Sequence, residues 1–146
     1  MRIFILAIAA GFLSTVSASA QDAAAGEKVF AQCKACHQLG ESAKNAVGPV
    51  LNGLFGRKSG TIEGFNYSPA NKNSGIIWDE ATFRDYIKDP KAKMPGTKMI
   101  FPGLKDPKQI EDVVAYLKQF NAAGKKAEMV PAGGKQATAQ LLMKGW

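Results

Sequence analysis

The sequence predicts a small all-α fold. Three segments place apolar residues at the spacing of a helix, and an aspartate suited to capping precedes two of them. No stretch alternates apolar and polar residues convincingly enough for a β-strand. A long glycine-rich segment separates the first of these helices from the others, and it indicates loop rather than regular structure.

The first helix is expected over residues 23 to about 36, where Gly26, Val29 and Phe30 can form a packing face. Glycines and polar residues dominate residues 38–66, which indicates a chain wrapped around something rather than folded on its own. Structureless segments of this length are uncommon in a small domain unless they have a function. A short helix is plausible around residues 68–72.

Asp79 offers an N-cap for the next helix, which should end at Asp89-Pro90. Its apolar stripe consists of Phe83, Tyr86 and Ile87. The last helix has the clearest signals, since Asp106 can cap it, Pro107 suits its first position and Gln109 completes a capping box. Its apolar residues are Ile110, Val113, Val114, Leu117 and Phe120, and Gly124 suits a stop after it.

The first 20 residues are typical of a secretory signal peptide. Met1-Arg2 is a minimal basic start, residues 3–13 are apolar or small, and Ala18-Ser19-Ala20 is a cleavage pattern. Cleavage after Ala20 would leave residues 21–124 as one small domain and residues 125–146 as a basic, mobile extension. The apolar run is shorter than the roughly 20 residues of a membrane span. An uncleaved anchor is the alternative.

The chain is basic, with a formal net charge of +7 that becomes +6 when Arg2 leaves with the signal. A basic composition can indicate nucleic acid or an anionic membrane as partner. The chain has only three arginines and no nucleic-acid-binding motif. An acidic protein partner is therefore the better interpretation.

Residues 33–37 read Cys33-Lys34-Ala35-Cys36-His37, and they include every cysteine and histidine of the chain. Cys-x-x-Cys-His is the attachment signature of a c-type haem. Cysteines three residues apart lie on one face of a helical turn, so both thiols can reach the vinyl groups of one porphyrin. The imidazole of His37 can then bind the iron. The motif predicts one covalent haem c, which would also explain the long loop.

Other interpretations of this motif fit the chain less well. A structural zinc site usually has four Cys or His ligands, whereas the chain has two cysteines and one histidine. A thioredoxin-like site needs a βαβ setting and has no use for the adjacent histidine. A disulfide between Cys33 and Cys36, in an oxidising compartment, is the remaining alternative.

The second axial position of the iron decides the chemistry, because a methionine closes the site for electron transfer whereas an open position admits small ligands or peroxide. The candidates after the signal are Met94, Met99, Met129 and Met143. The last two lie in the glycine-rich extension, which is a poor setting for a rigid site. Met94 and Met99 lie in a loop stiffened by prolines and glycines, and spacing alone does not choose firmly between them.

Longer stretches accompany these residues: Gly48-Pro49, GLFGRK at 53–58, ANKN at 70–73, Trp78, PGTKMIF at 95–101 and AYLK at 115–118. With the haem motif, they make residues 26–120 closely resemble class I cytochromes c, particularly the mitochondrial type and its bacterial cytochrome c2 relatives. The resemblance implies the small cytochrome c fold, with three main helices and long loops around one haem. It implies Met99 as axial ligand and Met94 as a packing residue. It says nothing of residues 121–146.

The same resemblance implies roles near the haem. The carbonyl of Pro49 would accept the second ring N–H of His37, and Tyr86 could donate to the sulfur of Met99. Arg57, Tyr67 and Trp78 match residues that pair with a buried propionate, while Asn71 and Thr97 match a polar network near the methionine. The walls would include Leu51, Leu54, Ile87, Phe101 and Leu117. The expected cofactor-binding residues are Cys33, Cys36, His37, Pro49, Arg57, Tyr67, Asn71, Trp78, Tyr86, Thr97, Met99 and Phe101, with His37 and Met99 as metal ligands.

The resemblance implies a monomeric, soluble, periplasmic one-electron carrier with no catalytic residues, since an iron with both axial positions filled cannot easily bind substrate. Its partners would be acidic redox proteins, with a cytochrome bc1-type donor and an oxidase or reaction centre as acceptor. Lysines near the Met99 loop could steer them, namely Lys88, Lys91, Lys93, Lys98 and Lys105. Two alternatives are a peroxidase-like haem enzyme with Met99 displaced and a membrane-tethered cytochrome subunit.

Overall fold

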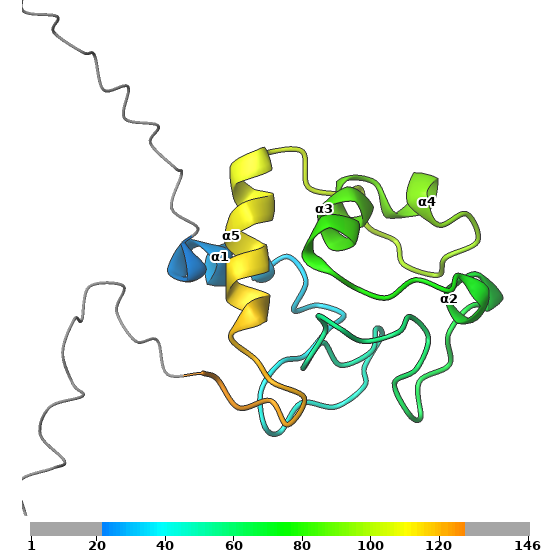
Figure 1. The fold of residues 1–146 in the computed structure, drawn as a ribbon, viewed down its shortest axis with the longest axis horizontal. Helices are drawn as coiled ribbons and strands as arrows, with labels where there is room; N and C mark the ends of the chain where they lie inside the picture. The colour runs from blue at the N-terminus through cyan, green and yellow to red at the C-terminus, as the bar shows by residue number, and fades with distance from the viewer. Residues whose placement is uncertain (1–21, 128–146) are drawn as a thin grey trace, which may run out of the picture.

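Helices α1 (Ala23–Phe30) and α5 (Pro107–Lys118) cross each other at one side of the molecule, as Figure 1 shows in blue and yellow. The computed structural model describes residues 22–127. At the crossing the rings of Phe30 and Tyr116 lie 5.4 Å apart. A Cβ atom on Gly26 would overlap the carbonyl of Asp112 and the side chain of Tyr116. Glycine at position 26 therefore lets the two helices approach closely, as the predicted packing face required.

The first helix is shorter than expected. It ends at Phe30, and the chain continues as tight turns in which Cys33 N–H bonds to Phe30 O and Cys36 N–H bonds to Cys33 O. Hydrogen bonds between residues three positions apart are typical of 3₁₀-type turns, which are frequent at the C-terminus of an α-helix. The haem motif consequently lies on turns just beyond α1.

The middle helices are α2 (Pro69–Asn73), α3 (Glu80–Lys88) and α4 (Pro90–Lys93). Asp79 caps α3 as predicted, with its carboxylate accepting the N–H of Thr82 at 2.7 Å. Helix α4 was not predicted from the sequence. Asp89 ends α3 and its side chain also accepts the N–H of Ala92, so the same residue caps the next helix.

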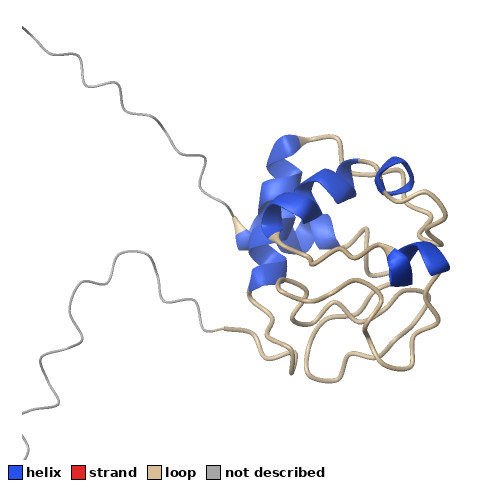
Figure 2. Ribbon diagram, turned by 45° about the vertical axis from the view of Figure 1, so that its right-hand side comes forward, coloured by secondary structure: helices blue, strands red, loops and turns tan. Residues whose placement is uncertain are grey.

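Residues 38–66 contain no helix, as expected. Within residues 22–127, the only β-bridge that involves them is the isolated one between Lys58 and Ile77. Figure 2 shows most of the helices in the upper part of the molecule and the loops mainly below them. The loops are fixed by polar contacts, in which the Asn52 amide bonds to both backbone groups of Gly40. The predicted all-α class and the helices flanked by long loops are confirmed.

After α5 the chain turns back on itself. Ala127 N–H donates to Gln119 O at 2.7 Å, and the ammonium of Lys126 lies 5.6 Å from the centre of the Tyr116 ring. Within residues 22–127 no helix is long and apolar enough to cross a membrane. The predicted signal peptide and most of the predicted extension, residues 128–146, lie outside the described residues.

Candidate haem site

A cavity of about 370 Å³ lies among the turns after α1, the 47–59 loop, α3, the 97–104 loop and α5. Its volume falls within the range of small-molecule and cofactor sites. Its walls include all of the expected cofactor-binding residues, namely Cys33, Cys36, His37, Pro49, Arg57, Tyr67, Asn71, Trp78, Tyr86, Thr97, Met99 and Phe101. The expected apolar wall residues line it too: Leu51, Leu54, Ile87 and Leu117.

The two cysteines sit on the turn that follows α1. His37 N–H donates to Cys33 O at 2.9 Å, and Gly48 N–H donates to Cys36 O at 2.8 Å, so the turn is tied to the loop opposite. Burial, together with the nearby Cys36, raises the pKa of the Cys33 thiol to about 11. A redox-active thiol of the thioredoxin kind needs a lowered pKa, so this environment does not suit that chemistry.

The orientation of His37 is fixed by its neighbours. Its Nδ1 lies 2.7 Å from the carbonyl oxygen of Pro49. Because a carbonyl can only accept, Nδ1 must carry the proton, and Nε2 keeps the lone pair that binds a metal. Burial lowers the pKa of His37 even though the Pro49 bond raises it, which favours the neutral ring. A Cβ on Gly48 would overlap the imidazole, so only glycine leaves room for the ring there.

Met99 has a hydrogen-bond donor aimed at its sulfur. The hydroxyl of Tyr86 lies 3.4 Å from Met99 Sδ, and burial raises the pKa of Tyr86, which keeps that hydroxyl protonated. Met99 N–H donates to Thr97 Oγ1, which in turn donates to Asn71 Oδ1, both at 3.3 Å. Met94 instead lies in the core with 3% of its surface exposed. The fold thus separates two methionines that spacing alone did not.

A basic group stands at another part of the cavity wall. The guanidinium of Arg57 donates to Asn52 O at 2.9 Å and to Val50 O at 3.2 Å, beside the buried rings of Tyr67 and Trp78. Burial lowers the pKa of Arg57 and raises that of Tyr67. A cation and polar rings at a cavity wall suit a ligand with an anionic end, since an unpaired buried carboxylate is costly.

The sequence missed several lining residues. Ser59 is 3% exposed, and its hydroxyl has no hydrogen-bond partner among the residues that the structure describes. Nothing in the sequence distinguishes it from other loop serines. The remaining ones include Phe65, Ser68, Leu104 and Val113. The helical spacing of Val113 marked it as buried, but only the fold decides that it faces the cavity.

The family model for cytochrome c matches residues 23–121. The chain belongs to the cytochrome c family. Cytochrome c2 of Blastochloris viridis is 68% identical over 113 residues, which cover 77% of this chain and 89% of that protein. Cytochrome c-550 of Nitrobacter winogradskyi is 60% identical over 104 residues, covering 71% of this chain and 95% of that one.

Solved structures agree with this placement in the cytochrome c family. Cytochrome cH from Methylobacterium extorquens superposes with a TM-score of 0.63 at 54% identity, covering 66% of this chain and 97% of that one. Cytochrome c2 from Rhodospirillum centenum gives a TM-score of 0.65 at 42% identity, covering 68% and 98%. The predicted resemblance and the predicted small cytochrome c fold are both confirmed.

Membership of the cytochrome c family implies a covalent haem c, and the residues present fit that group. Two thiols and an imidazole nitrogen border one cavity whose other walls are mainly apolar side chains. The half-buried cation of Arg57 suits the carboxylate end of a haem. The cavity thus offers attachment, an iron ligand and a charge partner in one place.

Proposed function

We propose that the chain is a one-electron carrier that holds its haem c through Cys33 and Cys36, with His37 and Met99 as the axial ligands. One observation carries this proposal: His37 and Met99 line the same cavity, and each has a hydrogen-bond partner that fixes its ligand atom. The relatives named cytochrome c2 support a carrier rather than an enzyme.

Bound haem c supplies one-electron exchange between ferrous and ferric iron. The protein's contribution is to keep both ligands in place in either state, which limits the rearrangement that accompanies each electron. Pro49 orients the imidazole, while Tyr86 and Thr97 hold the Met99 segment. Met99 as the second iron ligand would keep substrates and peroxide from the iron.

The chain is proposed to work in the periplasm after cleavage behind Ala20. The cleavage pattern and the export that haem attachment requires support this location. The mass of the exported protein tests it, because cleavage makes Gln21 the first residue. Recovery of a form that begins at Met1 and needs detergent for extraction would support the membrane-tethered alternative.

The proposed partners are acidic redox proteins, with a cytochrome bc1-type complex as donor and an oxidase or reaction centre as acceptor. The described lysines near Met99 differ in their pairing. Asp85 pairs with Lys88 and Lys93 at 3.4 and 3.3 Å, which reduces the local positive charge that the sequence suggested. Lys98 lines the cavity, and among residues 22–127 it donates only to a backbone carbonyl, that of Asn66. We therefore assign Lys98 a larger part than Lys88 or Lys93 in steering an acidic partner.

The test compares Met99→Ala with Met94→Ala, both matured with haem. Met99→Ala should lose the ferric Met–iron charge-transfer band and lower the reduction potential, because the iron loses its thioether ligand. Met94→Ala should keep the band and lose stability only, by roughly 2–5 kcal/mol for a buried methionine. An unchanged band in Met99→Ala would contradict the axial assignment and reopen an enzymatic role.

A further inference from the structure

Helix α3 supports the segment that carries Met99. We call residues 89–105 the Met99 arm. Its far end is tied to the C-terminus of α3, where Leu104 N–H donates to Ile87 O at 2.9 Å and Lys105 Nζ donates to Lys88 O. Gly103 has a φ of +91° and passes so close to the Lys88 carbonyl that no Cβ would fit. The arm therefore returns tightly against the last turn of α3.

Two further contacts tie the arm to α3. Near its start, Lys93 pairs with Asp85 at 3.3 Å. At its middle, the Tyr86 hydroxyl reaches Met99 Sδ at 3.4 Å. The arm is thus attached to α3 at its start, its middle and its end, while Thr97 and Lys98 also tie it to Asn71 and Asn66. The contacts at three points along the arm couple its position to that of α3.

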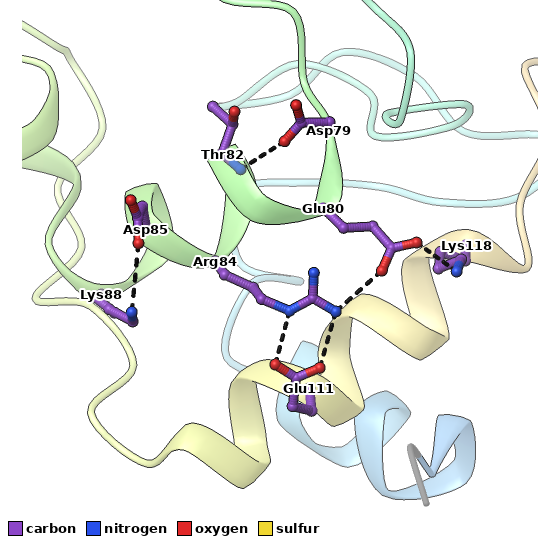
Figure 3. A network of polar contacts seen from close by, with 8 residues as sticks. All are labelled: Asp79, Glu80, Thr82, Arg84, Asp85, Lys88, Glu111 and Lys118. Atoms are coloured by element: carbon purple, nitrogen blue, oxygen red, sulfur yellow. Dashed lines mark hydrogen bonds and ion pairs between the residues drawn. The ribbon is translucent and has the colours of Figure 1, made fainter.

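The face of α3 that includes Phe83, Tyr86 and Ile87 lines the cavity, so its packing depends on what fills that space. A separate connection joins α3 to α5. Arg84 Nε donates to Glu111 Oε1 at 2.7 Å, and Arg84 Nη2 donates to Glu111 Oε2 at 2.9 Å. Figure 3 shows the guanidinium reaching from α3 to this carboxylate on α5.

Two more charges extend this pair into a network. Arg84 Nη2 also contacts Glu80 at 3.0 Å, and Glu80 pairs with Lys118 of α5 (Figure 3). Exposed ion pairs usually contribute little, but bidentate geometry and networks are the conditions under which they matter. The Arg84 side chain is also only 24% exposed. This network therefore connects α3 to α5 with a geometry that can stabilise their packing.

We propose that Arg84 is a positioning residue for Met99. Its bidentate bond to Glu111 fixes α3 on α5, and α3 in turn holds the Met99 arm closed. The inference rests on the proposed role of Met99 as axial ligand. When the arm opens and α3 loosens, the network is lost, so the network raises the free energy of the open state. Removing it should increase the open fraction without touching either ligand.

Imidazole binding to the ferric holoprotein measures that fraction. Imidazole can bind the iron only when Met99 has left, so its apparent affinity scales with the open population. Arg84→Met keeps the bulk of the side chain and removes the charge and the fork. We expect a roughly fivefold higher apparent affinity, the factor for an ion pair of about 1 kcal/mol. Arg84→Lys keeps the charge but lacks the forked guanidinium, so its imidazole affinity should lie between those of the wild type and Arg84→Met.

The matched control is Lys108→Met. Lys108 also forms an ion pair on α5, with Asp112 at 2.8 Å, but within that one helix. It should leave imidazole affinity unchanged. A double-mutant cycle between Arg84→Met and Glu111→Gln should show that the two effects are not additive. Hydrogen exchange adds an independent readout, in which the Leu104 amide loses protection while the His37 amide does not.

Different failures have different meanings. If the wild type shows the Met–iron band but Arg84→Met binds imidazole with the wild-type affinity, the positioning role is overturned and the proposed function is left intact. An equal rise in Arg84→Met and Lys108→Met also overturns it, because the effect would then reflect general destabilisation. A wild-type protein without the Met–iron band overturns the proposed function and this inference together.

Discussion

The hydroxyl of Tyr86 and the sulfur of Met99 lie 3.4 Å apart, although the residues belong to different elements 13 positions apart. Tyr86 is on α3, whereas Met99 is on the irregular segment between α4 and α5. Burial raises the pKa of Tyr86, so the hydroxyl keeps its proton and can donate it to an acceptor in the cavity wall. The thioether is a weak acceptor, and this contact links the side chain to the electronic properties of the site.

Tyr86→Phe should lower the reduction potential. With Met99 as the proposed axial ligand, a hydrogen bond to its sulfur would draw electron density away from the iron and favour the ferrous state, so its removal would favour the ferric state. A net hydrogen bond of about 1 kcal/mol corresponds to roughly 40 mV for a one-electron couple. Potentiometric titration measures the change. Tyr116→Phe alters another buried tyrosine away from the cavity and should leave the potential unchanged; equal shifts in both variants would count against the Tyr86–Met99 contact.

Gly48→Ala should impair haem attachment. The added methyl group would overlap the His37 ring, so the imidazole would have to leave its position against Pro49. Overpacking of this kind costs typically about 1–3 kcal/mol. The haem content of purified protein and its unfolding in guanidinium measure the two effects. Gly75→Ala is the control, since its φ of +68° imposes backbone strain but no atom lies near the added Cβ. Full haem loading of Gly48→Ala would show that the ring position is not critical.

Asp112→Asn should weaken the acid dependence of stability. Burial opposes the charged form of Asp112, but hydrogen bonds from Lys108 and from Asp22 N–H outweigh it and lower its pKa. Because the folded-state pKa lies below the unfolded value of about 3.9, this contribution is complete above that pH. It is lost as the pH falls through the folded-state pKa.

Guanidinium unfolding between neutral pH and about pH 3 measures this dependence. The variant should be less stable at neutral pH and should lose less stability on acidification than the wild type. Asp106→Asn is the control, because Asp106 is an exposed cap and asparagine caps equally well. An equal loss of stability on acidification in Asp112→Asn and in the wild type would contradict the role assigned to Asp112.

The positive charge near Met99 should act on small charged reagents. Ferrocyanide should reduce the ferric protein more slowly as ionic strength rises, because screening weakens the attraction. A cationic reductant such as hexaammineruthenium(II) should show the opposite dependence. Lys98→Gln should flatten both dependences, whereas Lys108→Gln, which lies on α5 beside Asp112, should have a smaller effect. The Met–iron band must persist in Lys98→Gln, and stopped-flow kinetics measure the rates. Identical salt dependence in both variants would argue against a special part for Lys98.

Local signals in the chain predicted much of this fold. Asp79 and Asp106 cap helices where the sequence placed them, because a cap depends only on residues one turn away. The first helix was drawn too long and α4 was missed, since ends of helices and four-residue helices depend on small differences in turn geometry. The long loop was recognised by its glycines, but its contacts were not.

The sequence by itself determined the chemistry available to this protein. One Cys-x-x-Cys-His motif and a small set of methionines follow from residue types and short spacings, which need no fold to be read. Tertiary structure alone decided which atoms face one another. It placed Met99 on the cavity and Met94 in the core, and it joined Arg84 to Glu111 across two helices. Within residues 22–127 it also left the Ser59 hydroxyl buried without a hydrogen-bond partner. Such relationships join residues far apart in the chain, and only the simultaneous packing of all the helices and loops brings them together.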